Sequence, residues 1–209
     1  MSNSNNRILK LFKSRKTVID LLRTQGFNVS DYEDFNINEI DAMYSKKQLD
    51  LKFTNQETQK NVYVKYFLDT KQIKPNTLDN IIEDLYEIES ILQKDDTLVI
   101  ITEDEPNDTI INKIKFLYDK DGIFVVIHNI QRLQFNILNH NLVPSMKILN
   151  DDEVDILKKK YNIQTLSQLP EISRFDPQAL AMCLRPGKIC QLTRNSVTAL
   201  ETNYYRVCV

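Results

Sequence analysis

Apolar positions in the first part of the chain follow helical spacing at first and strand spacing later. Apolar residues recur every three to four positions within residues 6–24, which predicts an amphipathic helix with a basic outer face. A shorter helix is expected at residues 37–48. Alternation with period two in residues 49–53 and 62–68, around a polar stretch, predicts a hairpin of two half-buried strands. The chain is therefore expected to begin with two helices and a hairpin.

A strand, a helix and a second strand follow one another in the next part of the sequence. The continuous apolar runs 97–101 and 123–127 predict buried strands, and the apolar spacing between them predicts a helix. This order with short connections favours a parallel βαβ unit. Ahead of it, Pro75 opens a helix whose apolar stripe continues to Leu92. We expect residues 1–138 to form one α/β domain with a small mixed sheet.

Shorter elements and more frequent prolines mark the chain from residue 139 onward. Acids followed by lysines predict a helix over residues 151–160, because these charges suit the two ends of a helix. Asp176-Pro177 predicts the capped start of another helix. Two strands are expected, at 188–194 and 204–209. Residues 139–209 should thus form a small α+β domain with a short antiparallel sheet, which makes the whole chain α+β.

Composition and charge exclude several classes of protein. With 42% hydrophobic and 27% charged residues the chain has an ordinary globular composition, and its net charge of −2 provides no overall basic field for nucleic acid. The apolar runs are too short to span a membrane, and the polar first six residues predict no secretory signal. Three cysteines without paired spacing favour free thiols in a reducing compartment. We expect no membrane partner.

No arrangement of residues in the sequence predicts a catalytic centre. Three glycines cannot build a phosphate loop, and neither the histidines nor the cysteines have the spacing of a metal site. We therefore expect no catalytic residue, no metal ligand and no cofactor. One alternative stays open, because Asp50-Leu51-Lys52 resembles part of the acid and lysine pattern of metal-dependent nucleases, although Tyr63 stands where the next strand would need an acid. The competing interpretation of Asp50 and Lys52 is a solvent-facing pair.

Five short motifs after residue 139 resemble, in order, those of one protein family. They are His140-Asn141-Leu142-Val143-Pro144, Leu169-Pro170-Glu171-Ile172, Asp176-Pro177-Gln178-Ala179, Leu184-Arg185-Pro186-Gly187-Lys188 followed by Arg194, and Tyr205-Arg206-Val207-Cys208. The family is that of the fifth subunit shared by eukaryotic nuclear RNA polymerases, together with its archaeal counterpart. Each motif alone is weakly specific, whereas five in order are a specific signal. The chain departs from the family at Met146, where a second histidine is usual.

The resemblance implies a non-catalytic subunit of a multisubunit DNA-directed RNA polymerase. Its C-terminal module would dock on the largest subunit within the polymerase complex. An extra N-terminal jaw domain, similar to restriction endonucleases but inactive, would lie near the incoming downstream duplex DNA. The residues expected to serve assembly are His140, Pro144, Pro170, Asp176, Pro177, Arg185, Gly187, Arg194, Tyr205 and Arg206.

Contact with DNA is expected to be weak, because residues 1–139 carry 18 basic and 22 acidic residues, a net charge of −4. It is expected to be non-specific, because contacts to phosphates carry no sequence information. The basic helix supplies Lys10, Lys13 and Lys16 as candidates for lying near DNA. Abundant Asn, Ile and Lys indicate an AT-rich genome. A large DNA virus with its own cytoplasmic polymerase is the source we favour, and a divergent protist is the alternative. The protein would then act in viral transcription in the host cytoplasm and the virion, or in the nucleus if it is cellular. The alternative function is a metal-dependent nuclease of restriction-endonuclease-like fold.

Overall fold

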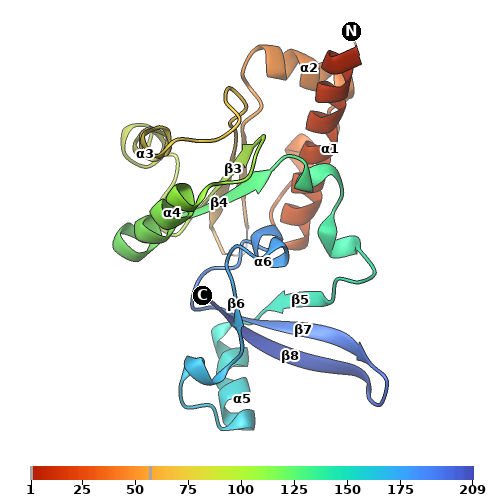
Figure 1. Cartoon of the computed structure of the whole chain (residues 1–209), viewed down its shortest axis with the longest axis vertical. Helices are drawn as coiled ribbons and strands as arrows, with labels where there is room; N and C mark the ends of the chain where they lie inside the picture. The colour runs from red at the N-terminus through yellow and green to blue at the C-terminus, as the bar shows by residue number, and fades with distance from the viewer. Residues whose placement is uncertain (1, 57) are drawn as a thin grey trace. The chain divides into compact units, whose positions relative to one another are not determined.

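The chain divides into two compact units, residues 1–136 and residues 137–209 (Figure 1). A computed structural model describes residues 2–56 and 58–209. Each unit combines helices with a four-stranded sheet that has both parallel and antiparallel pairs, so the predicted α+β class is confirmed. Within these described residues we find no helix that combines the length and the apolar character needed to cross a lipid bilayer.

The first unit is built on a sheet with the strand order β1-β2-β3-β4. The strands are β1 (Leu51–Thr54), β2 (Asn61–Tyr66), β3 (Thr97–Thr102) and β4 (Phe124–Asn129). β1 and β2 pair antiparallel, which confirms the predicted hairpin, whereas β2, β3 and β4 run parallel. Helix α4 (Asp108–Asp121) connects β3 to β4, so the predicted βαβ unit is confirmed as well.

Helices cover both faces of this sheet, with α3 and α4 on one side and α1 and α2 on the other (Figure 1). The remaining helical segments are α1 (Ser2–Thr24), η1 (Ser30–Tyr32), α2 (Ile37–Ser45), α3 (Pro75–Ile82), η2 (Glu83–Ile88) and η3 (Arg132–Gln134). Leu98 and Ile100 of β3 pack with Ile114 of α4 in one apolar cluster. All six residues of β3 are buried, as expected for a parallel strand covered on both faces.

The helix that opens at Pro75 does not continue to Leu92 as predicted. Its α-helical part ends at Ile82, and the π-helical turn η2 carries the chain on to Ile88. A π turn contains one more residue than an α turn, so Ile88 rotates out of the apolar stripe and is 69% exposed. Leu92 is buried all the same, because the loop after η2 folds back onto the core.

The second unit is built on a sheet with the strand order β5-β7-β8-β6. Its elements are η4 (Ile137–Asn139), β5 (Ser145–Ile148), α5 (Asp151–Tyr161), η5 (Leu166–Gln168), β6 (Glu171–Ile172), α6 (Pro177–Ala181), β7 (Ile189–Ser196) and β8 (Leu200–Cys208). β5 and β8 both pair antiparallel with β7, but β6 runs parallel to β8. The two predicted strands, at 188–194 and 204–209, pair antiparallel as expected, but the sheet also contains the parallel pair β6–β8 and is therefore mixed. The crossover through α5 returns the chain in its original direction, which makes β6 parallel to β5 and hence to β8.

Helix α5 confirms the helix expected over residues 151–160. Its start has a capping box, in which the side chains of Asn150 and Glu153 each accept a bond from the backbone of the other. Three acids lie in the first turn and three lysines in the last turn, where each kind of charge is favoured by the helix dipole. Leu157 anchors α5 in an apolar cluster with Leu149 and Ile189.

Candidate functional site

Helix α6 begins with the cap that the sequence predicts. The Oδ1 atom of Asp176 accepts a bond from the backbone N–H of Gln178 at 2.9 Å, and Pro177 occupies the first helical position. The buried side chain of Gln178 uses its Nε2 atom to donate to the carbonyl oxygen of Pro144 at 2.6 Å. One partly buried hydrogen bond thus joins two of the sequence motifs. Gln178 is missing from the residues expected to serve assembly, and its place inside the motif is the signal that could have found it.

Two further motifs meet the end of strand β8. The backbone N–H of Gly187 donates to the carbonyl oxygen of the last residue of β8 at 2.9 Å, and the carbonyl oxygen of Pro170 accepts a backbone N–H of β8 at 2.9 Å. Gly187 has φ of +82°, a region in which a Cβ atom would be strained. The Nη1 atom of Arg206 donates to the carbonyl oxygen of Glu171 at 3.2 Å. These contacts hold β6 against β8 and fix the turn that leads into β7.

The other residues expected to serve assembly differ in exposure. His140 is exposed, and its Nδ1 atom accepts a backbone N–H two residues further on at 3.2 Å. Arg194 is also exposed, with its guanidinium carbon 5.1 Å from the ring centroid of Tyr204. Tyr205 packs against the core instead, and Arg185 is half-buried. Most of the motif residues therefore stabilise the fold of the second unit itself, while His140 and Arg194 present side chains at its surface.

Three lysines of helix α1 form an exposed stripe. Lys10, Lys13 and Lys16 follow one another at intervals of three residues, so their side chains lie near one another along the helix. Within the described part of the chain, none of them pairs with a carboxylate. Lys10 and Lys13 line a cavity of about 750 Å³, whereas Lys16 lines another of about 320 Å³. The three candidate cations are all available to a ligand, but only two of them share a cavity.

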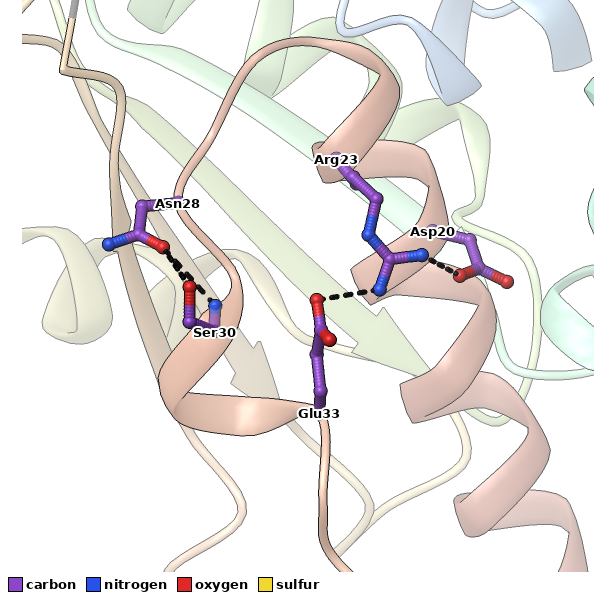
Figure 2. A network of polar contacts seen from close by, with 5 residues as sticks. All are labelled: Asp20, Arg23, Asn28, Ser30 and Glu33. Atoms are coloured by element: carbon purple, nitrogen blue, oxygen red, sulfur yellow. Dashed lines mark hydrogen bonds and ion pairs between the residues drawn. The ribbon is translucent and has the colours of Figure 1, made fainter.

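Two arginines of α1 are already engaged by acids of the first unit. The Nη2 atom of Arg7 lies 3.0 Å from Oε1 of Glu103. Arg23 bonds Asp20 at 3.0 Å and Glu33 at 2.7 Å, and Figure 2 shows its guanidinium between these two carboxylates. The hydrogen bond that Arg23 donates to Glu33 is the main cause that raises the pKa of Arg23. Neither arginine therefore adds a free charge to the lysine stripe.

Arg15 departs from the basic outer face that the sequence predicts for this helix. The residue is only 3% exposed. Helical spacing explains the error, because residue 15 lies on the same face as the buried residues Leu11, Val18 and Leu22. The basic face of α1 is therefore made by its lysines.

Asp50 and Lys52, the two residues of the nuclease-like pattern, contact other groups of the chain and not each other. The half-buried carboxylate of Asp50 accepts the backbone N–H of Tyr66 at 3.0 Å, the hydroxyl of Tyr63 at 3.2 Å and the Nζ atom of Lys65 at 3.3 Å. Lys52 is exposed and donates to a carbonyl oxygen in the loop after η2 at 3.4 Å. The interpretation of Asp50 and Lys52 as a solvent-facing pair holds for Lys52, which is exposed, but not for Asp50, which is half-buried. The β1–β2 register, extended by one pair, places Asp50 across from Lys65.

The tyrosines beside Asp50 are held in their neutral form. Burial raises the pKa of Tyr63, and the neighbouring charge of Asp50 raises it further. Burial also raises the pKa of Tyr66 to about 12, with its hydroxyl 3.4 Å from Oγ of Ser14. Both oxygens of Asp50 are thus taken up by donors of the chain itself. Over residues 2–56 and 58–209, the structure contains no group of three or more His, Cys, Asp or Glu side chains that could hold a metal ion.

The chain is similar to known polymerase subunits. A family model described as "RNA polymerase Rpb5, C-terminal domain" matches residues 135–208. The chain is 43% identical over 76 residues to "DNA-directed RNA polymerase subunit Rpo5" of Thermococcus kodakarensis, and 45% identical over 76 residues to the protein of that name from Pyrococcus abyssi. Each alignment covers 36% of this chain and 92% of the relative.

A plant relative extends the similarity beyond the second unit. The chain is 26% identical over 191 residues to "DNA-directed RNA polymerase V subunit 5A" of Arabidopsis thaliana, which covers 88% of this chain and 81% of that protein. An alignment of this length includes residues of both units. The archaeal relatives, by contrast, are aligned over nearly their whole length with about a third of this chain. On the strength of these matches and of the motifs joined in its second unit, the chain belongs to the Rpb5 family, the family of the fifth RNA polymerase subunit.

Proposed function

We propose that the chain is a non-catalytic subunit of a multisubunit DNA-directed RNA polymerase and that residues 137–209 dock on the largest subunit. The observation that carries this proposal is the coincidence of the family match, residues 135–208, with a compact unit that has its own core. The occupied carboxylate of Asp50 supports a subunit without its own chemistry.

The surface chemistry of the second unit suits a docking role. Its turns are fixed by internal bonds at Pro144, Pro170 and Gly187, so little conformational freedom remains to be lost on assembly. His140 and Arg194 offer exposed polar groups beside this fixed backbone. The planar guanidinium of Arg194 can bind a carboxylate of the largest subunit with two parallel hydrogen bonds.

Co-purification tests the proposed function directly. The tagged full-length chain, expressed in its native source and recovered under mild conditions, is expected to bring down the two large polymerase subunits in equal amounts. Mass spectrometry of the recovered proteins measures this. A chain recovered alone, or with proteins unrelated to RNA synthesis, would refute the proposal.

For the first unit we propose the role of a jaw domain near incoming downstream DNA. The plant relative supports this role, since its similarity to this chain extends into the first unit. Such similarity is expected if the first unit is the extra N-terminal jaw domain of the eukaryotic subunits. The exposed stripe of Lys10, Lys13 and Lys16 supplies the contacts to phosphate. Glu103 and Asp104 line the same cavity as the first two lysines, which weakens the local positive potential and keeps the DNA free to slide.

We expect the isolated chain to bind duplex DNA only weakly. A mobility-shift titration with a 30-base-pair duplex at physiological salt should give a Kd in the micromolar range or weaker, with an affinity that falls as salt rises. Changing Lys10, Lys13 and Lys16 together to Gln should flatten the salt dependence, by about 0.9 in log–log slope for each lysine that contacts a phosphate.

The matched control for this titration is the change of Lys158, Lys159 and Lys160 to Gln. These three lysines lie in the last turn of α5, in the other unit, and their loss should leave the salt dependence unchanged. Submicromolar binding by the wild type, or an equal effect of the two triple variants, would contradict the proposed contact.

The residue usage of the chain supports a viral source and a viral site of action. We propose a large cytoplasmic DNA virus, so that the protein would work in the host cytoplasm and be carried in the virion. In a cellular source the same protein would work in the nucleus. Location of the tagged chain by fluorescence in infected cells distinguishes the two.

A further inference from the structure

Arg15 is buried in the first unit with few partners. Its Nη1 atom donates to the carbonyl oxygen of Leu49 at 3.3 Å. Its guanidinium carbon lies 5.0 Å from the ring centroid of Phe35 and 5.8 Å from that of Tyr32. The Nε atom is buried and has no hydrogen-bond partner among the described residues. Aromatic faces attract a cation, but two rings and one carbonyl oxygen leave most of the five N–H donors of a guanidinium without an acceptor.

The charge of Arg15 has no counter-ion in the described part of the chain. Burial lowers the pKa of Arg15, because it removes the water that stabilises the charged form. The guanidinium still carries its charge at neutral pH, since the ordinary pKa of an arginine lies far above neutrality. No Asp or Glu among the described residues forms an ion pair with it. A buried charge is ordinarily paired, so Arg15 lacks the anion that its burial calls for.

A cavity of about 320 Å³ lies beside Arg15, which forms part of its wall. Phe12 and Ile19 of α1 and the rings of Tyr32 and Phe35 form an apolar part of the wall, whereas charged residues form the rest of it apart from Ile40. We call this space the Arg15 pocket. Its volume is at the lower end of the range for ligand pockets, which suits a single side chain and its neighbour.

Two of the three acids that line the Arg15 pocket, Asp20 and Glu33, are paired with Arg23. Figure 2 shows Arg23 between the carboxylates of Asp20 and Glu33, at 3.0 Å and 2.7 Å. The same view shows the side-chain oxygen of Asn28 accepting both the backbone N–H and the hydroxyl of Ser30, at 3.2 Å and 2.7 Å. These contacts fix the loop that follows α1 and direct two nearby carboxylates to Arg23.

We propose that the Arg15 pocket binds a Glu or Asp side chain of a partner protein, with Arg15 as its counter-ion. A carboxylate matches the planar fork of the guanidinium, and the apolar wall takes an apolar residue next to the acid. Lys16 adds a positive charge to the lining, which also contains Arg23 with its two acidic partners. Arg23 offsets the charges of Asp20 and Glu33, but Asp34 adds a further negative charge to the lining. This charge disfavours entry of a polyanion such as nucleic acid into the pocket and favours a peptide with one acidic anchor.

Nuclear magnetic resonance of the ¹⁵N-labelled full chain tests this proposal. The probe is the blocked dipeptide N-acetyl-Leu-Glu-amide, and its control is N-acetyl-Leu-Gln-amide, which has nearly the same shape without the charge. We expect the Leu-Glu peptide to shift the Nε–H resonance of Arg15 in a saturable way. The Leu-Gln peptide should bind at least about tenfold more weakly, because it offers no ion pair.

Two exposed acids of the same loop provide matched variants that leave the core intact. Asp34 lines the Arg15 pocket, whereas Asp31 does not. Asp34→Asn should tighten binding of the Leu-Glu peptide about threefold, because it removes a like charge from the mouth, while Asp31→Asn should leave the affinity unchanged. Equal binding of the two peptides, an unmoved Arg15 Nε–H resonance at saturation, or equal effects of both variants would overturn the proposal. A stronger response of Arg15 to inorganic phosphate or to a 20-base-pair duplex would overturn it in favour of nucleic acid.

Discussion

A chain that ends at residue 136 is expected to be absent from the purified polymerase, whereas residues 137–209 alone are expected to assemble with it. The second unit has two apolar clusters of its own and is compact by itself. An archaeal relative is aligned over 92% of its length in only 76 residues, so a protein of about this size is sufficient as a subunit in that organism. Both fragments, tagged at the N-terminus, can be recovered from the native source and the two large polymerase subunits quantified by mass spectrometry.

Both fragments must be shown to fold before their recovery with the polymerase can decide which unit docks. Circular dichroism should show cooperative thermal unfolding of both, because each unit contains a complete sheet. Recovery of the folded residues 1–136 with the polymerase would show that the first unit docks. The assignment of docking to the second unit would then be wrong.

Asp50→Ala is expected to lower the free energy of unfolding by about 2–3 kcal/mol. The change leaves the backbone N–H of Tyr66 and the ammonium group of Lys65 without their acceptor in a half-buried place. A donor without an acceptor lowers the stability of the fold most where water cannot replace the lost acceptor. Urea unfolding should show a lower midpoint with an unchanged slope, which reports stability alone.

Asp69→Ala is the matched control for this loss of an acid. The ion pair of Asp69 with Lys47 has an N–O distance of 3.4 Å, as against 3.3 Å for Asp50 with Lys65, but its side chains are 71% and 79% exposed. Water screens such a pair, so the cost should stay below about 1 kcal/mol. Equal destabilisation by the two changes would show that Asp50 has no special structural role. Cleavage of plasmid DNA by the wild type with Mg²⁺ or Mn²⁺, abolished by Asp50→Ala, would instead establish the nuclease function.

Elements with a strong local pattern could be predicted from the sequence. The apolar runs of β3 and β4, with a helical pattern between them, predict the parallel unit that the structure contains. The N-cap of α6 could likewise be predicted from Asp176 and Pro177, because a cap depends on adjacent residues only. In such places a few neighbouring residues determine the conformation.

Features that depend on tertiary contacts could not be predicted in this way. The π-helical turn η2 interrupts a stripe that looks continuous in the sequence, and β6 is too short to show any period. From the sequence, Arg15 is assigned to the basic outer face of α1, and only the structure shows that it lies on the buried face. The partner of Asp50 depends on strand register, which puts Lys65 opposite it in place of Lys52. Burial and strand register are determined by tertiary contacts, so the spacing of residues in the sequence predicts them poorly.

The strand order of the second unit also determines when its sheet can form during synthesis. Among the described residues, the two outer strands, β5 and β6, pair only with β7 and β8, which come later in the chain. Both outer strands therefore leave the ribosome with their edges unpaired, and the edges stay unpaired until the hairpin of β7 and β8 has emerged. Until then α5 is the main element of this region that can become ordered through local hydrogen bonds. A nascent chain that stalls before β7 thus exposes two strand edges at once, and such edges invite aggregation.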